Sequence, residues 1–97
     1  MAIKSKTASK LYDLMLRTTG KKVATSALKA MDAIQSDNAE NQLLAIGAVL
    51  VCLLNHYELD HVDVLGIAHN MVFAGENNNM IPEFKVITKF MKEEWEI

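Results

Sequence analysis

Two histidines and three carboxylates fall close together in the middle of the chain. His56 and His61 lie within eight residues of sequence that also contain Glu58, Asp60 and Asp63. Imidazole nitrogens and carboxylate oxygens are ligands for zinc and similar ions, so a metal site is the first chemistry to consider here. The spacing matches no standard metal motif, and capping of the free amides at a helix start already explains the acidic residues. We therefore predict no metal site and no cofactor.

Cys52 is the only cysteine and the strongest nucleophile in the chain. It lies in the apolar run Leu43–Leu54, and a thiol buried among aliphatic side chains is inert. The chain has no glycine-rich phosphate loop and no pattern that places a serine beside a base, so we predict no catalytic residue and no enzymatic activity. The lone cysteine and the lack of a secretory signal at the N-terminus favour a cytoplasmic protein.

The apolar run Leu43–Leu54 also organises the rest of the chain. Its twelve residues are about twice the usual strand length, and they fall short of the roughly 20 that a membrane-spanning helix needs. Asp37 and Glu40 form a capping box just before it, so we predict one helix over about 38–57 and no membrane association. Because this helix is apolar all round, it has to be covered on all sides. We expect it to be the buried centre of the fold.

The segments on either side of the central helix have the periodicity of amphipathic helices. We predict helices over about 4–19, 21–35, 60–74 and 82–95. Gly20 and Gly75 are expected to end helices in the left-handed region, and Pro82 to occupy a first helical position. The fold class is therefore all-α: residues 1–97 form a single domain, a compact bundle of about five helices around the buried helix 38–57.

Charge is strongly segregated along the chain although the net charge is only −2. Residues 1–29 carry +6, residues 30–80 carry −7 without any Lys or Arg, and residues 81–97 carry −1. A basic face on the first two helices could contact nucleic-acid phosphates, although it lacks side chains suited to base edges or base stacking. The residues of this face are Lys6, Lys10, Arg17, Lys22 and Lys29.

The last two predicted helices carry more apolar surface than a small core can use. Large exposed apolar patches mark interaction sites, and we expect Val86, Phe90 and Trp95 to contact a partner. The favoured function is a small non-enzymatic protein-interaction module, such as a regulator, inhibitor or adaptor, that occupies the surface of a partner protein. Self-association, as a homodimer or another homo-oligomer, is expected. The alternative is nucleic-acid binding through the basic face.

Overall fold

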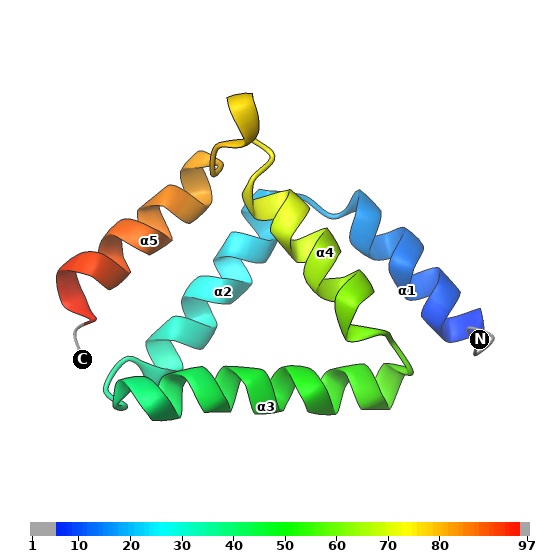
Figure 1. Cartoon of the computed structure of the whole chain (residues 1–97), viewed down its shortest axis with the longest axis horizontal. Helices are drawn as coiled ribbons and strands as arrows, with labels where there is room; N and C mark the ends of the chain where they lie inside the picture. Colours follow the sequence, from blue (N-terminus) through cyan, green and yellow to red (C-terminus); the bar gives the residue numbers. More distant parts are fainter. Residues whose placement is uncertain (1–5, 96–97) are drawn as a thin grey trace.

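The computed structural model describes residues 6–95, and these residues form five α-helices and no strand (Figure 1). The all-α class and the five-helix bundle are confirmed. The start predicted for the first helix, at residue 4, lies outside the described residues. The helices are α1 (Lys6–Arg17), α2 (Gly20–Ile34), α3 (Ala39–Tyr57), α4 (His61–Val72) and α5 (Pro82–Glu94), with a short 3-10 turn, η1 (Glu76–Asn78), before α5.

Short polar side chains begin α3 and α4. The side-chain oxygen of Asn38 accepts a hydrogen bond from the Asn41 amide at 3.1 Å, so the predicted cap at Asp37 is wrong by one residue. Asp60 is the N-cap of α4, as predicted, and accepts from the Val62 amide at 2.8 Å. Both caps satisfy amides that the first turn of a helix leaves without partners.

The glycines that were expected to end helices have other roles. Gly20 is the first residue of α2, and no glycine among residues 6–95 has a positive φ. A Cβ on Gly20 would collide with the side chain of Ile81, so this glycine permits close packing of α2 against the start of α5. The left-handed residue that ends a helix is instead Glu58, with φ of 56°, at the end of α3.

The core lies between α2 and α5, which pack together more closely than any other two helices in the described part of the chain. Its buried members are Ala24 and Met31 from α2 and Phe84 and Ile87 from α5. Partly buried apolar side chains surround this cluster, and they include Met71 and Val72 at the end of α4. The hydrophobic core is therefore small and lies at one side of the molecule.

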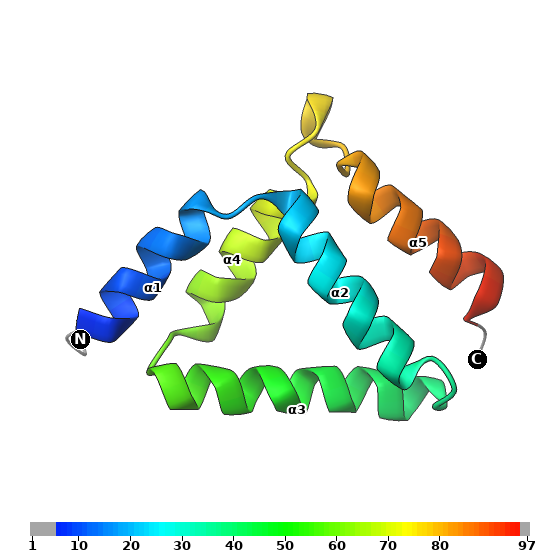
Figure 2. The same cartoon turned by 180° about the vertical axis from the view of Figure 1, so that it is seen from behind.

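The helices α2, α3 and α4 form the three sides of a triangle, with α5 outside α2 and α1 beside α4 (Figure 1). The molecule is flat, with extents of 43 × 32 × 20 Å. Its two broad sides differ, because α1 and α2 lie in front of α4 when it is seen from behind (Figure 2). Tyr12 ties α1 to the corner between α3 and α4, since its hydroxyl accepts a hydrogen bond from the Asp60 amide at 2.9 Å.

The predicted burial of the central helix is wrong. Helix α3 forms as expected, but Leu54 is the only buried residue in it. Four residues join α2 to α3 and three join α3 to α4, and these short connections direct α2 and α4 away from the two ends of α3. Neither neighbour runs along its length, so α3 is an edge of the triangle rather than its axis (Figure 1).

Candidate interaction surface

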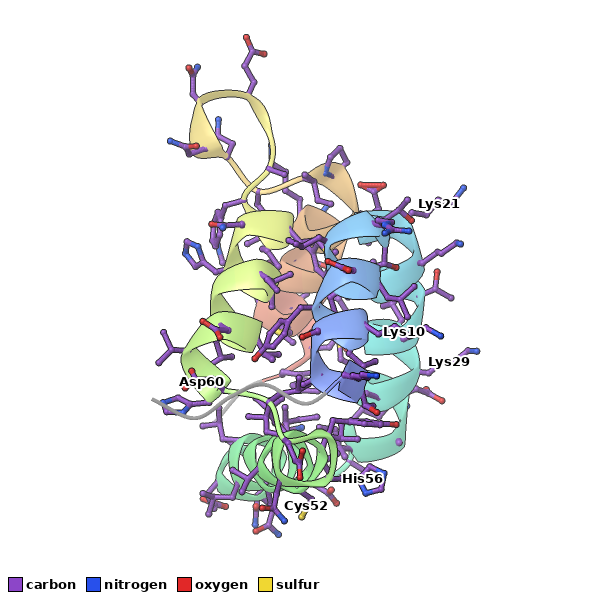
Figure 3. The ribbon with its side chains drawn as sticks, turned by 90° about the vertical axis from the view of Figure 1, so that its right-hand side faces the viewer. Lys10, Lys21, Lys29, Cys52, His56 and Asp60 are labelled. Carbon is purple, nitrogen blue, oxygen red and sulfur yellow. The ribbon has the colours of Figure 1, made fainter. Side chains whose placement is uncertain are left out.

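Helix α3 carries more exposed large apolar side chains than any other helix of the described chain. Leu54, which is 8% exposed, marks the side of α3 that faces the rest of the chain. Cys52 projects from the outer side, away from the other helices (Figure 3). Six large side chains of this helix are between 47% and 76% exposed: Leu43, Leu44, Ile46, Val49, Val51 and Leu53. A helix of this kind is normally covered, so its exposed face is the candidate interaction surface of the described chain.

Cys52 is exposed, which corrects its expected burial in the core. The correction follows from the edge position of α3. Among residues 6–95, the Cys52 thiol has no hydrogen bond to a general base, and nucleophilic catalysis by a thiol usually depends on such a base.

The three apolar residues expected to contact a partner from α5 separate into two environments. Val86 is 64% exposed and Phe90 is 39% exposed, so both lie on the surface. Trp95 instead packs against the core cluster between α2 and α5. Its indole N–H is buried and has no acceptor among residues 6–95. Trp95 is therefore part of the cover of the core, whereas Val86 and Phe90 extend the exposed apolar surface.

The lysines of α1 and α2 lie on the opposite side of the molecule from the start of α4. Lys10 of α1 and Lys21 and Lys29 of α2 project from the same side, and Asp60 lies on the other (Figure 3). We call the cationic residues of these two helices the basic flank. All of its members are exposed: Lys6, Lys10, Arg17, Lys21, Lys22 and Lys29. The labelled lysines of α1 and α2 and the carboxylate of Asp60 thus lie on opposite sides of the molecule.

The junction between α3 and α4 does not gather its histidines and carboxylates. His56 and Asp60 point in different directions (Figure 3), and the His56 ring lies edge-on to Tyr57 at 4.7 Å. Within residues 6–95, no three His, Cys, Asp or Glu side chains come close enough to hold a metal ion. The polar residues of this junction instead act in capping α4 and in holding α1.

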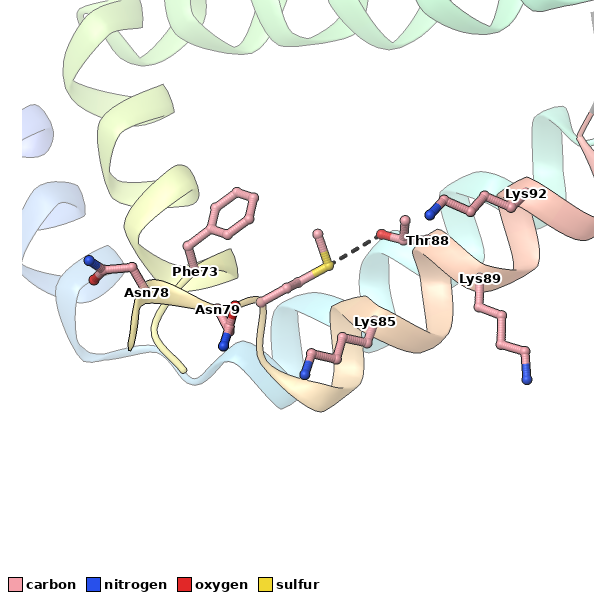
Figure 4. A pocket seen from close by; sticks show the side chains of 8 residues that line it. Phe73, Asn78, Asn79, Lys85, Thr88, Lys89 and Lys92 are labelled. Carbon is pink, nitrogen blue, oxygen red and sulfur yellow. Dashed lines mark hydrogen bonds between the residues drawn. The ribbon is translucent and has the colours of Figure 1, made fainter. Parts of the chain in front are cut away.

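One open groove of about 430 Å³ lies between the η1 turn and α5 (Figure 4). Three lysines line it, Lys85, Lys89 and Lys92, and Lys89 is 3.9 Å from Glu93. In this groove the Thr88 hydroxyl donates hydrogen bonds to the Phe84 carbonyl oxygen at 2.9 Å and to the Met80 sulfur at 3.2 Å. The groove lining holds no carboxylate or histidine that could act as a general base.

Comparison with known proteins leaves the chain to be interpreted from its own geometry. Among the described residues, α3 is the one helix that is long and apolar enough to cross a membrane. Of its 18-residue apolar window, 6% is buried. No protein-family model, curated protein or solved structure matches the chain.

Proposed function

We propose that this chain is a small non-enzymatic interaction module, a regulator, inhibitor or adaptor that acts by occupying the surface of another protein chain. The observation that carries the proposal is the accessible surface of the chain, which is larger than that of a typical folded monomer of the same mass. The accessible surface is 7726 Å², whereas a folded monomer of 10.8 kDa has about 5,500 Å². The difference of about 2,000 Å² belongs to one chain, and permanent protein complexes bury about 2,000 Å² or more over both partners together.

The chemical character of the excess surface supports a protein partner. The exposed side chains of α3 are aliphatic, and the exposed Val86 and Phe90 of α5 add to them. Aliphatic surface is stabilised when another apolar surface removes it from water, by about 25 cal/mol for each Å². The basic flank and the acidic remainder then serve to orient an approaching partner, because complementary potentials speed and align association.

Capture of binding partners in two matched variants tests this function. Val51→Asp on α3 should abolish capture of any protein held by the wild-type chain, because it places a charge in the contact. The control is Lys22→Ala on the basic flank, which should keep the same proteins bound at high salt. Quantitative mass spectrometry of both eluates measures the result. Equal capture by the wild-type chain and by Val51→Asp would rule out the apolar surface as the contact.

Nucleic-acid binding is a second candidate, and the gathering of Lys10, Lys21 and Lys29 on one side favours it. Such a contact releases counterions from the phosphate backbone, so the logarithm of the affinity falls linearly with the logarithm of the salt concentration. The double variant Lys22→Glu/Lys29→Glu should then abolish a gel shift of duplex DNA or RNA at low salt.

The matched control for this experiment is Lys85→Glu/Lys92→Glu, which changes the net charge equally but lies on α5. If the duplex is shifted by the wild-type chain and by the control, and not by the variant of the basic flank, the second candidate gains support. A wild-type chain that shifts no duplex at low salt eliminates it.

A further inference from the structure

Two open hollows meet beside the η1 turn. The groove of about 430 Å³ between η1 and α5 adjoins a second hollow of about 560 Å³ at the last turn of α4. Phe73 and Asn78 line both hollows, so the two form one continuous surface. We call this surface the η1 groove; it extends from His69 on α4 to Lys92 on α5.

One wall of the η1 groove is cationic. Lys85, Lys89 and Lys92 line it from α5, and their spacing of four and three residues places them on one face of the helix over about 10 Å. Their ammonium groups point in different directions rather than toward one point (Figure 4). Glu93 is 3.9 Å from Lys89, but no carboxylate of the described residues lines either hollow. This wall therefore suits an extended anion with several charges.

The other wall carries two rings. Phe73 projects into the groove from the end of α4, across from Thr88 and Lys92 (Figure 4). The His69 ring lies one turn earlier, with its centroid 4.8 Å from that of Phe73 and a tilt of 37° between the two planes. Phe73 is half-buried and His69 is exposed. Unpaired nucleobases stack on rings of these two kinds.

Three asparagines add amide groups to the same surface. Asn78 lines both hollows, Asn79 lines the one beside α5, and Asn70 lines the one beside α4. All three side chains are exposed. A primary amide offers two donors and one acceptor oxygen, and the edge of an unpaired base carries donors and acceptors that match them. The η1 groove thus combines cations, rings and amides.

We propose that the η1 groove binds single-stranded nucleic acid, with the phosphate backbone along the lysines of α5 and a base stacked on Phe73. A cationic groove beside rings on which bases stack is the arrangement that proteins use to hold single strands. The basic flank offers cations without such rings, so the ring wall is what distinguishes the two surfaces. This site is separate from the proposed contact through α3.

Other anions use only part of the groove. An acidic peptide can pair with the lysines, but it makes no use of the rings. The phosphates of a free mononucleotide are compact and call for converging donors, such as a glycine-rich loop at a helix N-terminus, whereas the three ammonium groups diverge. In a duplex the bases are paired and stacked on one another, so they cannot reach Phe73. A single strand uses both walls.

The first test is fluorescence anisotropy of labelled oligo(U) and oligo(dT), each of about 12 nucleotides, with the purified full chain. At low salt we expect saturable binding, about tenfold tighter than that of a duplex of the same length, because only unpaired bases stack on the ring. Phe73→Leu keeps an apolar side chain without the ring face and should weaken binding about 5- to 100-fold. The matched control is Phe90→Leu, an exposed ring of α5 outside the groove, which should bind as the wild type does. Circular dichroism checks that both variants stay helical.

The second test uses the salt dependence of the same binding. Lys85→Ala/Lys92→Ala removes two phosphate contacts, so the slope of the logarithm of affinity against the logarithm of salt concentration should become shallower by about 1.4. Lys22→Ala/Lys29→Ala on the basic flank changes the net charge equally and should keep the wild-type slope. Val51→Asp on α3 should leave binding of the oligonucleotides unchanged, so this site and the proposed function are tested independently.

Binding of either oligonucleotide with these losses supports the proposal, and each other outcome overturns it. A wild-type chain that binds neither probe at low salt has no such site. An unchanged affinity in Phe73→Leu removes the role of the ring. Loss of binding in the basic-flank variant but not in the α5 variant moves the contact to the basic flank. A labelled oligoglutamate that binds as tightly as the oligonucleotides indicates a site for acidic peptides, and ATP that displaces the probes at equal concentration indicates a site for free nucleotides.

Discussion

Replacing Phe84 by alanine is expected to lower the free energy of unfolding by about 3–5 kcal/mol. Phe84 is 8% exposed and packs in the cluster between α2 and α5, which contains most of the buried apolar side chains. Domains of this size are stable by about 5–15 kcal/mol, so the loss is a large part of the total. Urea unfolding followed by circular dichroism at a fixed protein concentration measures it.

Val86 provides the control, because it lies two residues away on the same helix and is 64% exposed. Val86→Ala should change the free energy of unfolding by less than about 0.5 kcal/mol. Similar losses for Phe84→Ala and Val86→Ala would mean that α5 does not hold its buried face against α2.

The second large effect is expected from alanine at Gly75, in the connection between α4 and α5. An added Cβ would lie 2.6 Å from the backbone oxygen of Asn79, which also accepts a hydrogen bond from the Gly75 amide at 2.9 Å. The backbone has to move, and this hydrogen bond is disturbed with it. Gly75→Ala should therefore cost about 1–3 kcal/mol in the free energy of unfolding.

Gly66, in the interior of α4, provides a matched control, because alanine there is expected to change the free energy of unfolding in the opposite direction. A Cβ at Gly66 meets nothing within 4 Å, so alanine there should raise the free energy of unfolding by up to about 1 kcal/mol through its better helix propensity. Thermal melts of Gly75→Ala and Gly66→Ala should shift in opposite directions. A shared direction would show that the η1 turn does not approach Gly75 as described.

The helices could be predicted from the sequence because their signals are local. Pro82 begins α5 and Asp60 caps α4, as expected, and both effects act within one helical turn. The cap of α3 was wrong by one residue because Asp37 and Asn38 are adjacent and both side chains can accept from a free amide. The glycines were misjudged for a different reason, since close packing and a left-handed φ favour the same residue type.

The position of α3 could not be predicted in the same way. Its apolar circumference indicates that it needs cover, but the pattern does not say whether the cover comes from the same chain or from another. The answer depends on the short connections after Ile34 and Tyr57, whose geometry directs α2 and α4 away from it. Surplus apolar surface was expected on the last two helices, and Val86 and Phe90 of α5 are indeed exposed, but the larger number of exposed apolar side chains, on α3, was missed.

The basic flank was predicted as a face because its lysines recur at helical spacing on α1 and α2. Which side of the molecule it occupies was not predictable, since that depends on the angle between the two helices. Trp95 was grouped with Val86 and Phe90 as a partner contact, although its spacing along α5 places it on the same stripe as Phe84 and Ile87, and it packs against the core with them. Periodicity shows which residues share one face of a helix. It does not show which other helix packs against that face.

The pairing of α2 with α5 has a consequence for how the chain folds as it is synthesised. The core joins Ala24 and Met31 to Phe84 and Ile87, so its two halves are made far apart in time and about fifty residues separate them. Helices α1 to α4 can form locally as they emerge from the ribosome, but the core cannot close until α5 is free. During that interval the apolar face of α2 is exposed in addition to α3, and exposed apolar surface on a partly folded chain favours aggregation.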